Sequence, residues 1–262
     1  MKLNTNSNVY TFVYAVVMVI IVAFLLAFVS SALKDTQEAN VANDTKGQIL
    51  SALRIDKNAV DVEATFAEKV QDKLFQNGEL VPYESDFLTS YGQAIKDGEL
   101  HVFEATTDDG VKYVIPVTGR GLWGGLWGYI ALNEDKQTVY GSYFYHESET
   151  AGLGARIGET EFQNRFQGKQ VFDENGDIAL TVVKAGSVKD DAHEVDGITG
   201  ATLTSNGVAA MVSEGLGKYA DFIGVPAQGA CCGGKSDCCG DKAECEKDAD
   251  CPAKQERTNV EQ

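Results

Sequence analysis

The stretch "LWGYIALNEDKQTVYGSYFYH", residues 126–146, decides how the chain folds. Two runs rich in aromatic and β-branched residues, 126–132 and 138–146, flank a polar connection that contains "NEDK". Such runs predict β-strands. Strands joined by so short a connection pair antiparallel, because a parallel crossover needs about a dozen residues or more. The stretch therefore predicts an antiparallel sheet.

Further strand signals extend this sheet on both sides. The runs "HVFEA" at 101–105, "KYVIPV" at 112–117 and "DIALTVVKA" at 177–185 have the same character. The segments "TTDDG" and "DENGD", which precede two of these strands, have the composition of turns. We therefore expect consecutive antiparallel strands.

Helices are expected before and after the strands. Segment 34–55 is polar with regularly spaced apolar residues, and segment 61–79 has an apolar face and a plausible stop at Asn77-Gly78. That apolar face contains Val62, Phe66, Val70 and Leu74. A short helix should follow the strand at 138–146, and a final helix should span about 205–223. The predicted fold class is α+β, with helices packed on a mainly antiparallel, twisted sheet.

The amino-terminal region predicts a membrane anchor. Residues 10–33 form an uncharged run of 24 residues, which as a helix covers roughly 36 Å. A cleaved signal peptide is the alternative, but its apolar part is usually about 7–15 residues long. Lys2 and the amino terminus precede the run, and Lys34, Asp35 and Glu38 follow it. This distribution favours a cytoplasmic amino terminus.

Charge and cysteine content limit the possible functions. A formal net charge of -17 argues against nucleic-acid binding, which needs clustered Lys and Arg. All six cysteines lie in the tail 226–262, at positions 231, 232, 238, 239, 245 and 251, without a CxxC…CxxC zinc spacing. We expect a flexible tail that is dispensable, handles metal or redox equivalents, or docks a partner. No cysteine-ligated cluster can lie in the body of the protein.

The segment "DGITGATLTS", 196–205, is rich in hydroxyl groups. Gly200-Ala201 leaves Thr202 open to approach, and the helix that follows offers backbone N–H groups and a positive dipole end to an anion. The simpler interpretation is that Thr204 or Ser205 caps this helix. Both interpretations can hold together, because they use different hydroxyls.

This segment resembles the attachment motif of covalent flavin proteins, Asp-x-x-(Ser/Thr)-Gly-Ala-(Thr/Ser). The pattern is filled by Asp196, Thr199, Gly200, Ala201 and Thr202. The resemblance implies that Thr202 carries FMN through a phosphoester bond.

Two other segments extend the resemblance. "GLWGGLWGYIAL" at 121–132 and "ETAGLGARIGETEFQNRFQGK" at 149–169 resemble the Gly-Leu-Trp-Gly and Glu-Thr-Pro-Gly-Leu-Gly segments of an FMN-binding domain. That domain occurs in the C subunit of the sodium-translocating NADH:quinone reductase and in the G subunit of the related Rnf complex. Ala151 replaces the Pro of the family, which questions the rigidity of that loop. The simpler interpretation is that the tryptophans are core residues and the glycines form turns.

The resemblance implies a set of FMN-binding residues and a division of the chain. The binding residues are Trp123, Glu149, Thr150, Leu153, Gly154, Lys169, Asp196, Thr199, Gly200, Ala201, Thr202, Leu203 and Thr204. The expected parts are a short amino-terminal segment (1–9), the membrane helix (10–33), a helical connection (34–80), the FMN-binding domain (81–225) and the cysteine tail (226–262). We expect no catalytic residue and no metal ligand, and surface or packing roles for the three histidines.

The resemblance implies an electron-relay subunit, with electrons passing through FMN. The complex would couple NADH oxidation and ubiquinone or menaquinone reduction to sodium export. It would lie in the bacterial inner membrane, with the flavin domain on the periplasmic side and a flavin transferase for maturation. Since the chain has no GxGxxG fingerprint and no second membrane span, other subunits must complete the reaction.

Other functional interpretations stay open at this point. The chain could be the G subunit of an Rnf-type complex, because both complexes use this domain. From different classes, it could be a membrane-anchored metal-binding or thiol protein that works through its tail, or a regulatory flavin domain. Bound metal without flavin would favour the thiol protein, and flavin without a co-purifying membrane complex would favour the regulatory domain.

Overall fold

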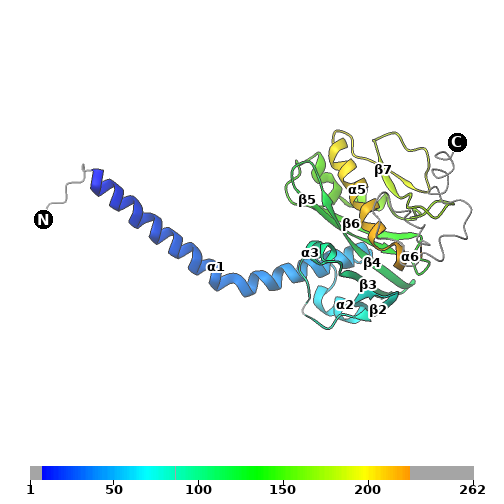
Figure 1. Ribbon diagram of the computed structural model, residues 1–262, viewed down its shortest axis with the longest axis horizontal. Helices are drawn as coiled ribbons and strands as arrows, with labels where there is room; N and C mark the ends of the chain where they lie inside the picture. The colour runs from blue at the N-terminus through cyan, green and yellow to red at the C-terminus, as the bar shows by residue number, and fades with distance from the viewer. Residues whose placement is uncertain (1–7, 86, 225–262) are drawn as a thin grey trace, which may run out of the picture. The chain divides into compact units, whose positions relative to one another are not determined.

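A single long helix begins the described part of the chain. The computed structural model describes residues 8–85 and 87–224 (Figure 1), so the cysteine tail lies outside it. Helix α1 (Asn8–Ala52) has an 18-residue window with a mean hydropathy of 3.1 and no buried residue. Its end, from Thr45 to Ala52, is mostly buried in the domain. The predicted membrane span and the predicted first domain helix are therefore one continuous helix.

A six-stranded sheet forms the centre of the domain. Its strand order is β2-β1-β3-β4-β5-β6, and every neighbouring pair is antiparallel. The strands are β1 (Val70–Gln76), β2 (Glu79–Pro82), β3 (Leu100–Thr107), β4 (Gly110–Arg120), β5 (Gly125–Leu132) and β6 (Val139–His146). The predicted α+β fold with a mainly antiparallel sheet is confirmed, and the stretch that predicted it forms β5 and β6.

Short elements and one longer helix complete the domain. They are α2 (Val62–Lys69), α3 (Gly92–Lys96), the 3-10 helix η1 (Gly154–Gly158), α4 (Thr160–Asn164), α5 (Thr202–Lys218) and α6 (Ala220–Ile223). Strands β7 (Thr181–Val183) and β8 (Glu194–Asp196) pair in parallel as a separate small sheet. The strand predicted at 177–185 is therefore shorter than expected and does not join the main sheet.

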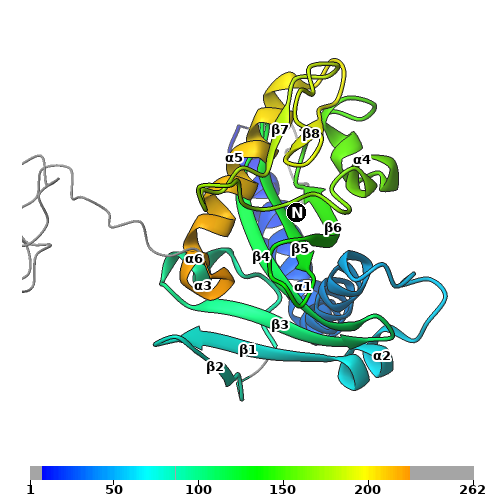
Figure 2. The same cartoon turned by 90° about the vertical axis from the view of Figure 1, so that its right-hand side faces the viewer.

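The main sheet has a hydrophobic core on each face. Along β5, Leu126 and Ile130 belong to the core that contains α5, whereas Tyr129 and Ala131 belong to the core that contains the end of α1. This alternation follows from the period of two in a strand. Figure 2 shows α5 and α1 on opposite sides of β4 and β5. Because both faces are covered, β5 is buried along most of its length.

The helix predicted at 61–79 is wrong beyond Lys69. Helix α2 ends there, and β1 pairs with β2 on one side and with β3 on the other. Asn77 and Gly78 have φ values of 53° and 85°. Two consecutive residues with positive φ form the tight turn that joins hairpin strands. Asn77-Gly78 therefore turns a hairpin and does not stop a helix, and the sheet begins within the predicted connection 34–80.

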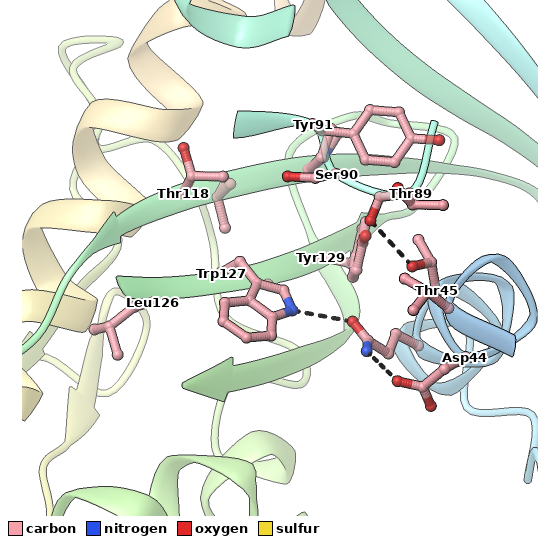
Figure 3. Close-up of a pocket in the computed structure, with 14 residues that line it drawn as sticks. Asp44, Thr45, Thr89, Ser90, Tyr91, Thr118, Leu126, Trp127 and Tyr129 are labelled. Carbon is pink, nitrogen blue, oxygen red and sulfur yellow. Dashed lines mark hydrogen bonds between the residues drawn. The ribbon is translucent and has the colours of Figure 1, made fainter. Parts of the chain in front are cut away.

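Hydrogen bonds fix the end of α1 to the sheet, at a place that we call the α1 junction (Asp44, Thr45, Gln48, Thr89 and Trp127; Figure 3). The indole N–H of Trp127 donates to Gln48 Oε1 at 3.1 Å. The Gln48 amide donates to Asp44 Oδ2 at 2.8 Å, and the Thr45 hydroxyl donates to the carbonyl of Thr89 at 3.3 Å. A cavity of about 370 Å³ adjoins these contacts.

Candidate functional site

Three segments that are far apart in the sequence line one pocket of about 240 Å³. They are the loop after β4, the loop after β6 and the start of α5, which contain the three motifs found in the sequence. The lining residues are Leu122, Glu149, Thr150, Leu153, Gly154, Gly200, Ala201, Thr202, Leu203 and Thr204. We call this the flavin pocket, after the cofactor that the motifs predict.

Thr202 is the first residue of α5 and is exposed. The first hydrogen bond within the helix runs from the N–H of Ser205 to the carbonyl of Ala201. The N–H groups of residues 202–204 precede that bond and have no acceptor inside the helix. Gly200 has a φ of 82°, which a glycine adopts without strain. An exposed hydroxyl therefore lies at the positive end of a helix dipole.

The prediction that Thr204 or Ser205 caps this helix is wrong. The helix begins at Thr202 after Ala201, and no side chain caps it. Both hydroxyls are buried within its first turn. Thr204 donates to Glu149 Oε2 at 2.7 Å, and the Ser205 hydroxyl oxygen accepts the N–H of Ile198 at 3.1 Å. The helix starts earlier than predicted, so these hydroxyls bind neighbouring segments.

Glu149 connects the three segments of the pocket. It is 7% exposed. Its Oε1 accepts the backbone N–H of Trp123 at 2.8 Å, and its Oε2 accepts the hydroxyl of Thr204. Burial alone would raise its pKa, but the hydrogen bonds from Trp123, Thr204 and the backbone of the 122–124 segment outweigh burial. The pKa of Glu149 is therefore lowered, and its side chain is a carboxylate at neutral pH.

The loop after Glu149 forms its turn without the proline of the predicted motif. The N–H groups of Leu153 and Ala155 both donate to the carbonyl of Thr150 at 3.1 Å. Gly152, the third residue of the turn 150–153, has a φ of 76°. A positive φ at this position is typical of a type II turn, whose second position, here Ala151, favours Pro. Ala151 is therefore compatible with the loop conformation.

Three exposed leucines form an apolar rim around Thr202. Leu122, Leu153 and Leu203 are 49%, 44% and 59% exposed, and all three line the pocket. A Cβ atom on Gly200 would lie 3.1 Å from Leu153 Cδ2, so the two loops nearly touch. Leu122 was missed in the sequence, although it lies inside the quoted Gly-Leu-Trp-Gly segment. Its position next to Trp123 was the available signal.

Four of the predicted binding residues lie outside the pocket lining: Trp123, Lys169, Asp196 and Thr199. The Trp123 side chain is 67% exposed, and its backbone N–H binds Glu149. Lys169 donates to the carboxylate of Asp191 at 2.7 Å, and also to the carbonyl of that residue. Asp196 accepts the N–H of Gly186 at 2.6 Å. The structure therefore places nine of the thirteen predicted residues in the pocket lining.

The chemistry of the pocket fits part of a flavin nucleotide. The leucine rim offers an apolar surface to a flat ring, and the start of α5 offers N–H groups to a phosphate. Pockets that enclose a ligand of drug size usually measure about 300–1,000 Å³, more than this pocket provides. A flavin nucleotide would therefore extend beyond the pocket, and a covalent bond would help to retain it.

Comparisons with known proteins agree with this assignment. A family model described as FMN-binding domain matches residues 121–217. The C subunit of the Na(+)-translocating NADH-quinone reductase of Vibrio campbellii is 34% identical over 212 residues, which cover 71% of this chain and 81% of that protein. The corresponding subunit of Neisseria meningitidis serogroup A is 32% identical over 199 residues, covering 67% of this chain and 77% of the relative.

Two solved structures resemble the chain in fold. The crystal structure of the C subunit of the Na(+)-translocating NADH-quinone reductase from Parabacteroides distasonis is 37% identical, with a TM-score of 0.67. The match covers 73% of this chain and 96% of that chain. The crystal structure of NqrC from Shewanella oneidensis is 25% identical, with a TM-score of 0.61, and covers 71% and 98% of the two chains.

Proposed function

The chain belongs to the family of the C subunit of the Na(+)-translocating NADH-quinone reductase, and from this membership we propose that it is the electron-relay subunit of such a complex. It has an FMN-binding domain, and its amino-terminal helix fits a membrane anchor. Oxidation of NADH, reduction of ubiquinone or menaquinone, and movement of sodium would then belong to other subunits. The flavin domain would pass electrons between its neighbours.

The FMN is attached covalently to Thr202 in this proposal. The observation that carries it is the position of Thr202: an exposed hydroxyl, at the start of α5, inside a pocket lined by three separate motifs. The Thr202 oxygen forms a bond to the flavin phosphorus of an activated flavin phosphoanhydride. The anhydride P–O bond breaks, a nucleotide phosphate leaves, and the hydroxyl proton passes to solvent. A flavin transferase would catalyse this step.

The other residues of the pocket orient the cofactor. The N–H groups of residues 202–204 face the phosphate, and the rim of Leu122, Leu153 and Leu203 lies against the ring. When bound, FMN supplies the redox chemistry. Because the pocket encloses only part of such a group, one edge of the ring stays accessible, which is what exchange of electrons with two partners requires.

We further propose an orientation in the membrane. Lys2 and the amino terminus precede the apolar span, which favours a cytoplasmic amino terminus in the bacterial inner membrane. The flavin domain then lies on the periplasmic side, together with the flavin transferase. This arrangement predicts that an impermeant reagent added to intact spheroplasts labels an engineered cysteine in the domain.

Peptide mass spectrometry tests the attachment site. The full chain is produced together with its flavin transferase, digested, and searched for the peptide that holds residues 196–205. We expect a flavin monophosphate on Thr202 and a band that fluoresces under ultraviolet light on a denaturing gel. A modification on Thr199 or Thr204, or a dark band in place of the fluorescent one, would refute the proposal.

A further inference from the structure

The loop between β4 and β5 forms a tight turn next to the carboxylate of Glu149. The N–H of Gly121 donates to the carbonyl of Gly124 at 2.9 Å, which closes the turn. The N–H of Trp123, in the middle of this turn, donates to Glu149 Oε1 at 2.8 Å, and the backbone N–H groups of Leu122 and Gly124 also help to lower the pKa of that carboxyl group. Successive N–H groups of this kind make a concavity that binds an anion. In this protein the anion is the side chain of Glu149.

Thr204 is a second hydrogen-bond donor to the same carboxylate, at 2.7 Å from Oε2. Each carboxylate oxygen therefore already accepts a hydrogen bond from the protein, Oε1 from the N–H of Trp123 and Oε2 from the hydroxyl of Thr204. The side chain is also buried, at 7% exposed, so the protein itself engages this acceptor.

Two glycines allow the segments to approach Glu149 closely. A Cβ atom on Gly121 would collide with Glu149 Oε1. A Cβ atom on Gly154 would lie 2.5 Å from both Glu149 Oε2 and Thr204 Oγ1. Glycine therefore occupies the two positions, 121 and 154, at which a side chain would collide with the Glu149 carboxylate.

The position of Thr204 links this cluster to the proposed attachment site. Thr204 lies two residues after Thr202 in the first turn of α5, where no side chain caps the helix. The bond between Thr204 and Glu149 therefore attaches the first turn of this helix to the loop after β6. It also fixes that helix end relative to the turn that carries Leu122.

We infer that Glu149 is a positioning residue, which locks the 121–124 turn to the first turn of α5 and so presents Thr202 for attachment, and that it is not a hydrogen-bond partner of the flavin. This inference rests on the proposed attachment to Thr202. It changes the role of Glu149 from the one that the sequence resemblance implied.

The test measures the rate of flavin attachment in the full chain. Purified Glu149→Gln, Thr204→Val and Thr204→Ser variants are incubated with flavin transferase and its flavin substrate, and fluorescence of the denatured band is followed with time. A glutamine presents an NH₂ group to N–H donors, and a valine leaves one carboxylate lone pair without its donor. We expect both to slow attachment by about tenfold, and Thr204→Ser to stay within about twofold of the natural sequence.

A matched control and a second measurement separate positioning from direct contact. Glu147→Gln removes an exposed carboxylate that accepts the N–H of Gly125 at 3.1 Å but does not contact α5, and its attachment rate should be unchanged. Once flavin is attached, its midpoint potential in Glu149→Gln should equal that of the natural sequence, because a positioning residue forms no hydrogen bond with the ring.

Each outcome decides the inference. A normal attachment rate in Glu149→Gln and Thr204→Val, or a changed midpoint potential in Glu149→Gln, would overturn it. If Glu149→Gln does not fold, the comparison of Thr204→Val, which has no hydroxyl, with Thr204→Ser, which keeps one, decides alone. Absence of flavin on Thr202 in the natural sequence would instead refute the proposed attachment itself.

Discussion

The flavin pocket and the α1 junction hold their parts together in different ways. In the flavin pocket the buried carboxylate of Glu149 accepts the backbone N–H of Trp123 and the hydroxyl of Thr204, and glycines permit the close approach. At the α1 junction the contact joins two side chains, Gln48 and Trp127, which lie 79 residues apart. The backbone turns of the flavin pocket need glycines at fixed positions, and these appear as short sequence motifs. At the α1 junction Trp127 lies within one of these motifs, but its partner Gln48 does not, so no motif marks the pair.

The largest expected effect separates attachment from folding. Thr202→Ala should abolish covalent flavin completely, because the proposed acceptor oxygen is removed. The helix should stay intact, because no side chain caps α5 and Thr202 is exposed. Fluorescence of a denaturing gel measures the flavin, and circular dichroism measures the fold.

Two further substitutions serve as controls for Thr202→Ala. Thr202→Ser keeps a hydroxyl and should retain attachment, and Thr199→Ala removes a neighbouring exposed hydroxyl and should leave a fluorescent band. A fluorescent band in Thr202→Ala would mean that another residue carries the cofactor. Unfolded Thr202→Ala protein would mean that this threonine also has a structural role in the pocket.

At the α1 junction we expect the opposite pattern, with loss of stability and unchanged flavin. Trp127→Phe keeps an aromatic ring but removes the N–H that donates to Gln48 Oε1. Gln48 is 5% exposed, so its oxygen loses a partner in a buried position. The free energy of unfolding should fall by about 1–3 kcal/mol. Urea unfolding of the full chain in detergent measures this change, and gel fluorescence measures the flavin.

Tyr145→Phe provides the control for that substitution. The Tyr145 ring lies 5.3 Å from the Trp127 ring, but its side chain is 43% exposed. Removal of its hydroxyl should change the unfolding free energy by less than about 0.5 kcal/mol. Equal losses in the two variants, or loss of flavin in Trp127→Phe, would show that the two regions are not independent.

Acid should act on the flavin pocket through Glu149. Its pKa in the folded protein is lowered from the usual 4.5, mainly by the Trp123 N–H and the Thr204 hydroxyl acting against burial. A depressed folded pKa contributes stability that is present above the unfolded pKa and is lost as pH falls through the folded value. The natural sequence should therefore be more stable than Glu149→Gln at pH 7, and this advantage should shrink below about pH 4.5. Thermal unfolding from pH 7 to pH 3 measures it.

The same titration of Glu147→Gln identifies the responsible carboxylate. Glu147 accepts one N–H from the same turn and is exposed. Its replacement therefore removes a carboxylate from the same turn without touching the bond between Glu149 and Thr204. If Glu149→Gln and the natural sequence gave parallel acid profiles, the hydrogen bonds to Glu149 would not contribute to folding as proposed.

The sequence predicted the parts of the molecule that depend on local pattern. The strands β5 and β6 follow from alternating aromatic and β-branched residues, and the lining of the flavin pocket follows from three motifs. The hairpin at Asn77-Gly78 was missed because the helical spacing of Val70 and Leu74 was given more weight than the turn signal that follows them. The Asn77-Gly78 turn signal was present in the sequence. The pairing of β1 with β3 stabilises residues 70–76 as a strand and not as a helix.

Other features could not be predicted from one sequence. Whether Thr204 caps its helix or reaches Glu149 depends on where α5 begins and on a residue 55 positions away. The contact between Gln48 and Trp127 likewise depends on how the end of α1 packs on the sheet. The hydrogen-bond partners of Thr204 and Gln48 are determined by tertiary packing, which leaves no local pattern in the sequence.

The smallest expected effect concerns the flavin pocket before any cofactor is attached. Ala151 occupies the second position of the turn 150–153, where a proline fits the backbone of a type II turn. Ala151→Pro should raise the free energy of unfolding by about 0.4–1 kcal/mol, chiefly by restricting the unfolded chain. The same substitution at Ala155 should destabilise the protein, because the N–H of Ala155 donates to Thr150. Urea unfolding of both variants measures the difference. Destabilisation by Ala151→Pro would mean that this loop is not a type II turn. The backbone conformation of the loop after β6, which lines the flavin pocket, would then differ from the one described above.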